Sequence, residues 1–367
     1  MMSIVARRDL VLSIAGLGLA LLGCSKNETS STSSGAASGG AAASATPVAA
    51  QVTNTVNLVG SGASFPAPLY GRWFKEYAQA NKAIAVDYQS VGSGQGIKSF
   101  VEGRTDFGAS DAAMSDDEIK QANDNVLLLP MTAGSVVLSY NLDGISDLKL
   151  SREAYAGIFL GEIKNWNDAK IAKANPGVKL PDQAISVVHR ADGSGTSFIF
   201  TQHLAAINEK WKSGPGVGKS VEWPAGVGEK GNEGIAANIK KNPGAVGYVE
   251  YAYAVLSKMP MASLENKSGK FIAPTLDSAA ASLAAVELPA NMRAWVTDPE
   301  GDASYPIASY TWILAHKKYD DAAKAKAVKE TLKWCLTEGQ KLSASLQYVP
   351  LPSAVATKVL AAVDSIN

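Results

Sequence analysis

A turn rich in hydrogen-bond donors lies near the middle of the chain, at His189–Ser197, with the sequence His-Arg-Ala-Asp-Gly-Ser-Gly-Thr-Ser. A short β-branched segment at 184–188 precedes it, and apolar residues with helical spacing follow at 198–207. The turn therefore joins a predicted strand to a predicted helix, whose first backbone N–H groups lack partners within the helix. Such N–H groups, together with hydroxyls and the guanidinium of Arg190, can bind a small anion.

The tripeptide Gly-Ser-Gly also occurs twice earlier, at 60–62 and 92–94, each time after a β-like segment and before a helical pattern. A single turn of this kind often does no more than cap the helix that follows. Three such turns and one arginine can, however, surround one oxyanion. Taken together, they favour an anion-binding site over three unrelated caps.

The elements that must position these turns alternate between short strands and helices, which is typical of α/β proteins. Predicted strands lie at 56–59, 84–88, 127–130, 135–140, 184–188, 244–249 and 305–314. Predicted helices lie at about 66–79, 96–102, 151–166, 198–207 and 320–346. The segment Gly226–Gly231 has the spacing of a dinucleotide fingerprint, but it follows Trp223-Pro224 and not a clean strand, so we expect a loop there.

The first 24 residues have the features of a signal peptide. Arg7 and Arg8 precede an apolar run at 10–22, which is too short to span a membrane. The run ends in Leu-Leu-Gly-Cys and resembles the lipobox of bacterial lipoproteins, in which the cysteine, here Cys24, is lipidated. Residues 25–53 are rich in Ser, Ala and Gly and predict a flexible tether. We expect a lipid-anchored protein on the periplasmic or cell-surface side of a membrane.

The remaining part of the chain, about 310 residues, is longer than a single hydrophobic core usually reaches. We expect two lobes, the first formed by 54–137 plus 307–367 and the second by 138–306, with a cleft between them lined by helix N-termini. Lys plus Arg and Asp plus Glu both total 34, and this balance argues against a nucleic-acid partner.

Four motifs occur in order, at 60–68 (Gly-Ser-Gly-Ala-Ser-Phe-Pro-Ala-Pro), 106–111 (Asp-Phe-Gly-Ala-Ser-Asp), 190–197 (Arg-Ala-Asp-Gly-Ser-Gly-Thr-Ser) and 247–253 (Gly-Tyr-Val-Glu-Tyr-Ala-Tyr). With these motifs the chain resembles the substrate-binding protein of the bacterial high-affinity phosphate ABC importer. The resemblance implies an α/β, type II-like, two-lobe periplasmic binding protein that holds inorganic phosphate in the cleft between its lobes. It also implies no cofactor and no metal, a monomer, and a membrane permease as the partner.

The resemblance also implies a set of phosphate ligands. Transferred by position, the set is Ser64, Phe65, Ser93, Asp111, Arg190, Asp192, Ser194, Gly195 and Thr196. Arg190 is then expected to contact the anion in a bidentate manner, and Asp192 to pair with its guanidinium and fix its plane. The family often has threonine at the position of Ser64, and both residues supply a hydroxyl.

Asp111 is an unusual member of this set, because a carboxylate repels an anion unless a proton lies between them. Phosphate at neutral pH carries such a proton, whereas sulfate has none. Sites that hydrogen-bond a ligand O–H reject analogues without it by about 10⁴ to 10⁵. Ser115 and Glu118 already form a capping box for the next helix, so Asp111 is not needed there. The hypothesis is that Asp111 accepts the hydrogen bond of the phosphate proton.

Two alternatives stay open, a secreted phosphatase-like hydrolase that uses one of the serines, and a binder of another tetrahedral oxyanion such as molybdate or sulfate. His189, Asp192 and Ser194 are the residue types of a catalytic triad, but they lie within one turn. Triad members converge from separate elements, so we expect a binding protein and not an enzyme.

Overall fold

The computed structural model describes residues 55–284 and 286–367. The predicted signal peptide, the lipidated Cys24 and the tether at 25–53 lie outside the described residues. Within the described ranges, no helix combines the length and the apolar character that crossing a membrane requires.

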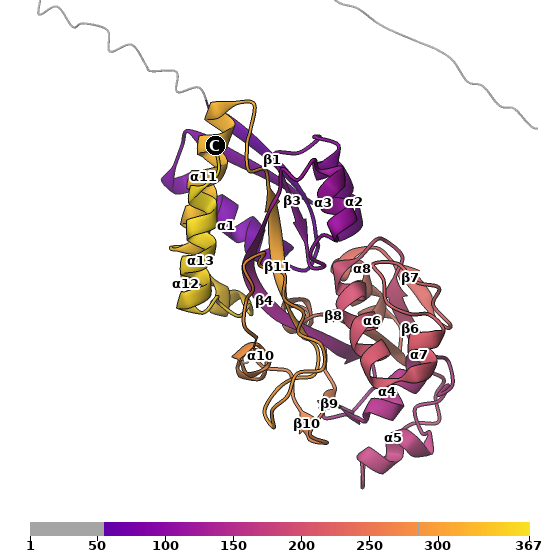
Figure 1. Cartoon of the computed structure of the whole chain (residues 1–367). Coiled ribbons are helices and arrows are strands. Elements are labelled where there is room, and N and C mark those ends of the chain that lie inside the picture. The colour runs from indigo at the N-terminus through magenta and orange to yellow at the C-terminus, as the bar shows by residue number, and fades with distance from the viewer. Residues whose placement is uncertain (1–54, 285) are drawn as a thin grey trace, which may run out of the picture. The chain divides into compact units, whose positions relative to one another are not determined.

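An eight-stranded mixed sheet runs through this part of the chain, in the order β2-β1-β3-β11-β4-β8-β6-β7 (Figure 1). Its strands are β1 (Val56–Gly62), β2 (Ile84–Ser90), β3 (Phe107–Ser110), β4 (Leu127–Tyr140), β6 (Ser186–Arg190), β7 (Val227–Glu229), β8 (Ala245–Glu250) and β11 (Ala308–Ala315). A small second sheet contains β5 (Lys149–Leu150), β9 (Ser263–Glu265) and β10 (Phe271–Ile272). The predicted α/β class is confirmed.

Each end of the large sheet is a parallel group, and two antiparallel strands join the groups. β1 pairs in parallel with β2 and β3, and β6 pairs in parallel with β7 and β8. Between them, β4 pairs with β11 over 127–135 and with β8 over 136–140. This change of partner lies close to the lobe boundary expected at 137/138, and the boundary itself stays a prediction.

The prediction of two separate strands at 127–130 and 135–140 is wrong, because β4 is continuous. Its pairing with β11 shifts register, so that Thr132 lies opposite Thr311 while Pro130 lies opposite Trp312. One extra residue on β4, Met131, therefore forms a bulge. Proline lacks an N–H group and is tolerated within a sheet at such an irregularity.

The helices cover both faces of the sheet. They are α1 (Ala67–Ala80), α2 (Ser93–Val101), α3 (Asp116–Gln121), α4 (Arg152–Phe159), α5 (Ala169–Ala174), α6 (Gly195–Ile207), α7 (Glu209–Ser213), α8 (Gly231–Lys241), α9 (Tyr251–Leu256), α10 (Leu276–Ala284), α11 (Ala322–Leu336), α12 (Gln340–Ser343) and α13 (Ser353–Asp364). In Figure 1, α1, α11 and α13 lie on one side of the β1–β3–β11 region, and α2 and α3 lie on the other.

Two predicted helices are shorter in the structure. The helix expected at 151–166 ends at Phe159, and Gly161 follows in the left-handed region with φ +70°. The helix expected at 320–346 stops at Leu336, and α12 begins only at Gln340. The carbonyl of Gly339, in the break, accepts a hydrogen bond from Trp73 Nε1, so the interruption attaches this region to α1.

Aromatic clusters stabilise each parallel group. In the first group, Tyr70 of α1 stacks on Trp73 and meets Tyr88 edge-on. In the second, Tyr248 of β8 stacks on Phe200. Burying each such ring stabilises the fold by roughly 1.5–3 kcal/mol.

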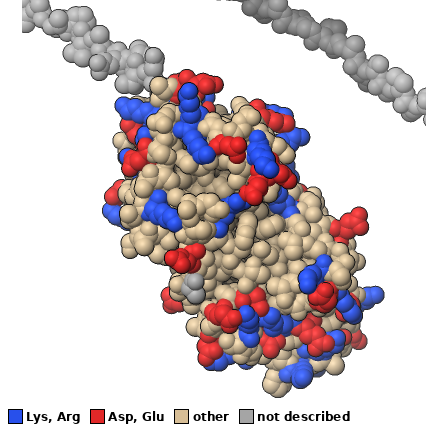
Figure 2. All heavy atoms as spheres, in the orientation of Figure 1, with Lys and Arg blue, Asp and Glu red and all other residues tan. Residues whose placement is uncertain are grey.

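On the surface, basic and acidic side chains are interspersed over the face that Figure 2 shows.

Candidate anion-binding site

The turn after β1 places Ser64 and Phe65 directly before α1, and both residues are buried. Ser64 Oγ accepts hydrogen bonds from the backbone N of Asn232 at 3.1 Å and from its Nδ2 at 2.9 Å. The carbonyl of Ser64 accepts a third from the Tyr253 hydroxyl at 2.7 Å, and that of Phe65 accepts one from the Tyr348 hydroxyl at 2.7 Å. The first turn is thus attached to α8 and α9.

The turn after β2 begins α2 with Ser93, which is fully buried. Ser93 Oγ accepts hydrogen bonds from the backbone N–H groups of Asp111 at 3.2 Å and Gly195 at 3.1 Å. A Cβ at Gly195 would lie 2.5 Å from Ser93 Oγ and 2.6 Å from the Asp111 side chain. Glycine is therefore required at 195 for the two turns to approach each other.

Asp111, at the end of β3, is 1% exposed. Its Oδ1 accepts a hydrogen bond from the Thr311 hydroxyl at 2.8 Å. Burial raises the pKa of Asp111 to about 7, although the Thr311 bond and the nearby charge of Arg190 act to lower it. The capping box of Ser115 and Glu118 is confirmed, so Asp111 does not cap α3. Its carboxyl group can gain or lose a proton near neutral pH.

Arg190, at the end of β6, is 3% exposed, and the structure confirms its predicted pairing with Asp192. Nε and Nη2 donate to the two carboxylate oxygens at 2.7 and 2.5 Å, and Nη1 donates to Thr196 Oγ1 at 3.4 Å. Asp192 also accepts from the backbone N of Gly231 at 3.1 Å. A guanidinium has five N–H groups, so two are left for an anion after these three bonds.

The turn that starts α6 contributes backbone and hydroxyl groups. Ser194 is the N-cap of α6, with its Oγ accepting from the Ser197 backbone N at 3.0 Å. Gly195 donates its N–H to Ser93, and Thr196 accepts from both Arg190 and Asn232. Hydrogen bonds and chain neighbours thus connect all nine predicted residues into one cluster, in which every member except the partly buried Asp192 is buried. Their role as ligands stays a prediction.

Asn232, Tyr248 and Thr311 also contact the cluster, and none of them is among the site residues predicted from the sequence. The Tyr248 hydroxyl accepts a hydrogen bond from the Arg190 backbone N at 2.9 Å. Asn232 directly follows Gly226–Gly231, and the expectation of a loop there is wrong, because the segment contains β7 and leads into α8. It is a strand-to-helix turn like the others. Its helix-starting glycine was the signal that could have revealed Asn232.

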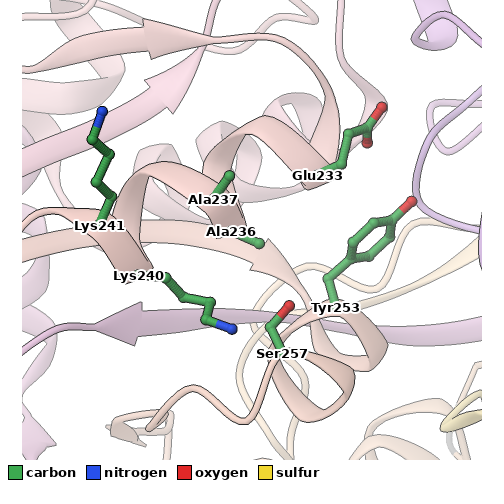
Figure 3. A pocket seen from close by; sticks show the side chains of 7 residues that line it. All are labelled: Glu233, Ala236, Ala237, Lys240, Lys241, Tyr253 and Ser257. Carbon is green, nitrogen blue, oxygen red and sulfur yellow. The ribbon is translucent and has the colours of Figure 1, made fainter.

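A cavity of about 520 Å³ lies between α8 and α9, and Tyr253 is one of the residues that line it (Figure 3). Glu233 and Tyr253 point to the same side of it, with Lys240 and Ser257 at the other end. None of the predicted anion ligands lines this cavity. Tyr253 lines the cavity and also donates its hydroxyl hydrogen to the carbonyl of Ser64.

Comparisons with known proteins give consistent results. Residues 34–338 match the family model of the PBP superfamily domain. The phosphate-binding protein PstS of Pasteurella multocida (strain Pm70) is 44% identical over 316 residues, which cover 85% of this chain and 91% of that protein. The corresponding PstS protein of Methanocaldococcus jannaschii is 39% identical over 339 residues, covering 86% and 87%.

Solved structures show the same fold at lower sequence identity. The periplasmic phosphate-binding protein PfluDING, solved with bound phosphate, has a TM-score of 0.71 and 22% identity, over 83% of this chain and 93% of that chain. A phosphate-binding protein from Stenotrophomonas maltophilia has a TM-score of 0.65 and 22% identity, over 83% and 93%. These likenesses support the two-lobe periplasmic binding protein fold.

Proposed function

The chain belongs to the family of PstS phosphate-binding proteins, within the PBP superfamily, and we propose its function on that premise. It binds inorganic phosphate with high affinity and delivers it to the permease of a phosphate ABC importer. The observation that carries the proposal is the cluster in which Ser64, Ser93, Asp111 and Arg190, from four separate turns, are buried and connected.

The cluster offers donors for phosphate oxygens and one acceptor for the phosphate proton. The two remaining N–H groups of Arg190 and the hydroxyls of Ser64 and Thr196 are the donors, whereas the Ser93 hydroxyl donates to Asp111 Oδ2 at 3.5 Å. Hydrogen bonds between a charged and a neutral group gain strength in a water-poor site. Asp192 neutralises the arginine, so the site selects its ligand by the pattern of donors and acceptors and not by net charge.

Asp111 supplies the acceptor and thereby discriminates phosphate from sulfate. Above its pKa of about 7, the carboxylate accepts a hydrogen bond from a protonated phosphate oxygen and repels sulfate. Below that pH, Asp111 is protonated and can donate to sulfate. Discrimination against sulfate is therefore expected to weaken as the pH falls through 7.

Calorimetric titrations of the purified protein with phosphate and sulfate at pH 8 test this proposal. We expect tight phosphate binding and a preference over sulfate of about 10⁴-fold. In Asp111→Asn, the amide can donate to sulfate, and the preference should fall by at least about 100-fold. A variant that discriminates as well as the wild type would contradict the role of Asp111.

The relatives are named as binding proteins, so the hydrolase alternative is not favoured. A chromogenic phosphate ester should be left intact over hours, and sustained turnover would overturn the proposal. Competition with molybdate tests the other alternative, and phosphate is expected to displace it.

We place the protein on the periplasmic side as a monomer, anchored by lipid on Cys24 and extended from the membrane by residues 25–53. Lobes at 54–137 plus 307–367 and at 138–306 close on the phosphate. The antiparallel connection through β4 and β11 supports these bounds. Replacing Cys24 by serine is expected to release the protein from the membrane fraction.

A further inference from the structure

Asn232 is a fully buried amide at the second position of α8. Its Oδ1 accepts a hydrogen bond from the backbone N–H of Glu250 at 2.9 Å. A backbone N–H can only donate, so this contact fixes which end of the amide is the oxygen. The Nδ2 group must therefore point the other way, toward Ser64 and Thr196.

Nδ2 donates to Ser64 Oγ at 2.9 Å and to Thr196 Oγ1 at 3.2 Å, which uses both of its hydrogens. The backbone N of Asn232 also donates to Ser64 Oγ at 3.1 Å, and Arg190 Nη1 donates to Thr196 Oγ1 at 3.4 Å. A hydroxyl oxygen has two lone pairs and one hydrogen. Both lone pairs of each hydroxyl are thus occupied, and its own hydrogen is left to donate to a ligand.

We propose that Asn232 is a positioning residue that sets the Ser64 and Thr196 hydroxyls as donors for the bound anion. The inference rests on the proposed phosphate-binding function. Hydroxyls held in one orientation do not have to reorganise when the anion arrives, which improves affinity.

The same amide connects the two proposed lobes. Ser64 belongs to the first lobe, whereas Asn232 and Thr196 belong to the second. Nδ2 can therefore contact both hydroxyls only when the lobes are close together. The orientation of the Ser64 hydroxyl is in this way coupled to lobe closure.

A purely structural role is the competing explanation, since Asn232 also attaches α8 to the end of β8 through Glu250. A double-mutant cycle separates the two roles. Phosphate is titrated calorimetrically into the wild type, Asn232→Ala, Ser64→Ala and the double variant. Asn232→Ala should weaken binding by about 10- to 100-fold. In the Ser64→Ala background, Asn232→Ala should reduce phosphate affinity by a factor at least about five times smaller, because the two residues act together.

Asn238→Ala is the matched control. Asn238 lies on the same helix and is half-buried, and its Nδ2 donates to Glu229 Oε1 at 2.7 Å and not to any of the predicted ligands. This variant should bind phosphate within about twofold of the wild type. Thermal melts without phosphate report whether each variant is folded.

Asn232→Asp is a second variant, for the case in which the alanine variant does not fold. Aspartate retains an acceptor for the Glu250 N–H, but it presents a second acceptor to Ser64 and Thr196 and draws their hydrogens away from the ligand. We expect binding at least about tenfold weaker than that of the wild type. Binding equal to the wild type, or single-variant losses that simply multiply in the double variant, would overturn the inference. A wild type that does not bind phosphate would instead refute the proposed function.

Discussion

Two arginine–aspartate pairs in the described chain are both bidentate and have very different surroundings. Arg190 donates to both oxygens of Asp192 at 2.7 and 2.5 Å, and Arg152 donates to both oxygens of Asp298 at 2.7 Å. The first pair joins residues two apart within a turn. The second joins α4 to a segment 146 residues later.

The residues around the two pairs differ in which hydrogen-bonding groups are left available for a ligand. Beside Arg190 lie hydroxyls with hydrogens to donate and the titratable Asp111. Beside Asp298, in contrast, His203 Nε2 is already bonded to the Tyr155 hydroxyl at 2.8 Å, and His203 Nδ1 is 3.9 Å from Asp298 Oδ1. A bidentate ion pair therefore does not mark a binding site by itself. The feature that distinguishes the candidate site is a set of neighbouring hydrogen-bond donors around Arg190.

The largest expected effect is the difference in phosphate affinity between variants of the two arginines. Arg190→Ala removes two charge-assisted hydrogen bonds to phosphate, together about 4 kcal/mol, so affinity should fall by about 1,000-fold. Arg152→Ala should leave affinity within about threefold of the wild type, while its unfolding free energy falls by about 2–3 kcal/mol, because Asp298 is left buried without its partner. Calorimetry and denaturant unfolding measure both quantities. Similar affinity losses in the two variants would remove the distinction.

The next effect concerns pH. Burial lowers the pKa of His203 to about 4, with Asp298 acting to raise it and Arg152 to lower it. The unfolded chain binds a proton below about 6.5 and the folded chain does not, so stability is lost as the pH falls from about 6.5 to 4. Relative to His203→Gln, the wild type should lose about 3 kcal/mol of unfolding free energy over this range, measured by urea unfolding.

Asp111 is expected to change the unfolding free energy with pH in the opposite direction to His203, which provides a check on that result. Its pKa is raised, so the folded chain keeps a proton that the unfolded chain has released. Stability from this group is therefore lost as the pH rises from about 4 to about 7. If Asp111→Asn and His203→Gln shifted the pH profile in the same direction, the assigned burial of one of them would be wrong.

The smallest effect is expected for Ser64→Thr. Threonine keeps the hydroxyl with its two lone pairs and one hydrogen, and adds only a methyl group. Phosphate affinity should stay within about threefold of the wild type in a calorimetric titration. A loss as large as that of Arg190→Ala would show that shape at this turn matters more than its hydrogen bonds.

Local patterns in the sequence correctly predicted where the turns of the candidate site lie. Gly-Ser-Gly at 92–94 and the donor-rich turn at 190–197 both lie where a strand meets a helix, and the pairing of Arg190 with Asp192 follows from their closeness in sequence. These features depend on interactions between residues that are close in sequence, so they can be predicted from the sequence alone.

Contacts between distant segments could not be predicted in this way. Thr311 reaches Asp111 from 200 residues away, and Asn232 reaches Ser64 from 168. Thr311 has no local pattern that distinguishes it from an ordinary strand residue. Gly231 marks the start of a helix beside Asn232, but nothing local indicates that Asn232 contacts Ser64. The bulge in β4 near Pro130 was missed for the same reason, since the partner strand that accommodates it comes much later in the chain.

The position of β11 in the sheet has a consequence for biosynthesis. β11 lies between β3 and β4, yet it is translated roughly 170 residues after β4 ends. At a translation rate of about 5–20 residues per second, roughly 10 to 35 seconds pass before β11 can pair with the facing edges of β3 and β4. During that interval the nascent polypeptide cannot complete its sheet, so the native fold forms only after β11 has been made.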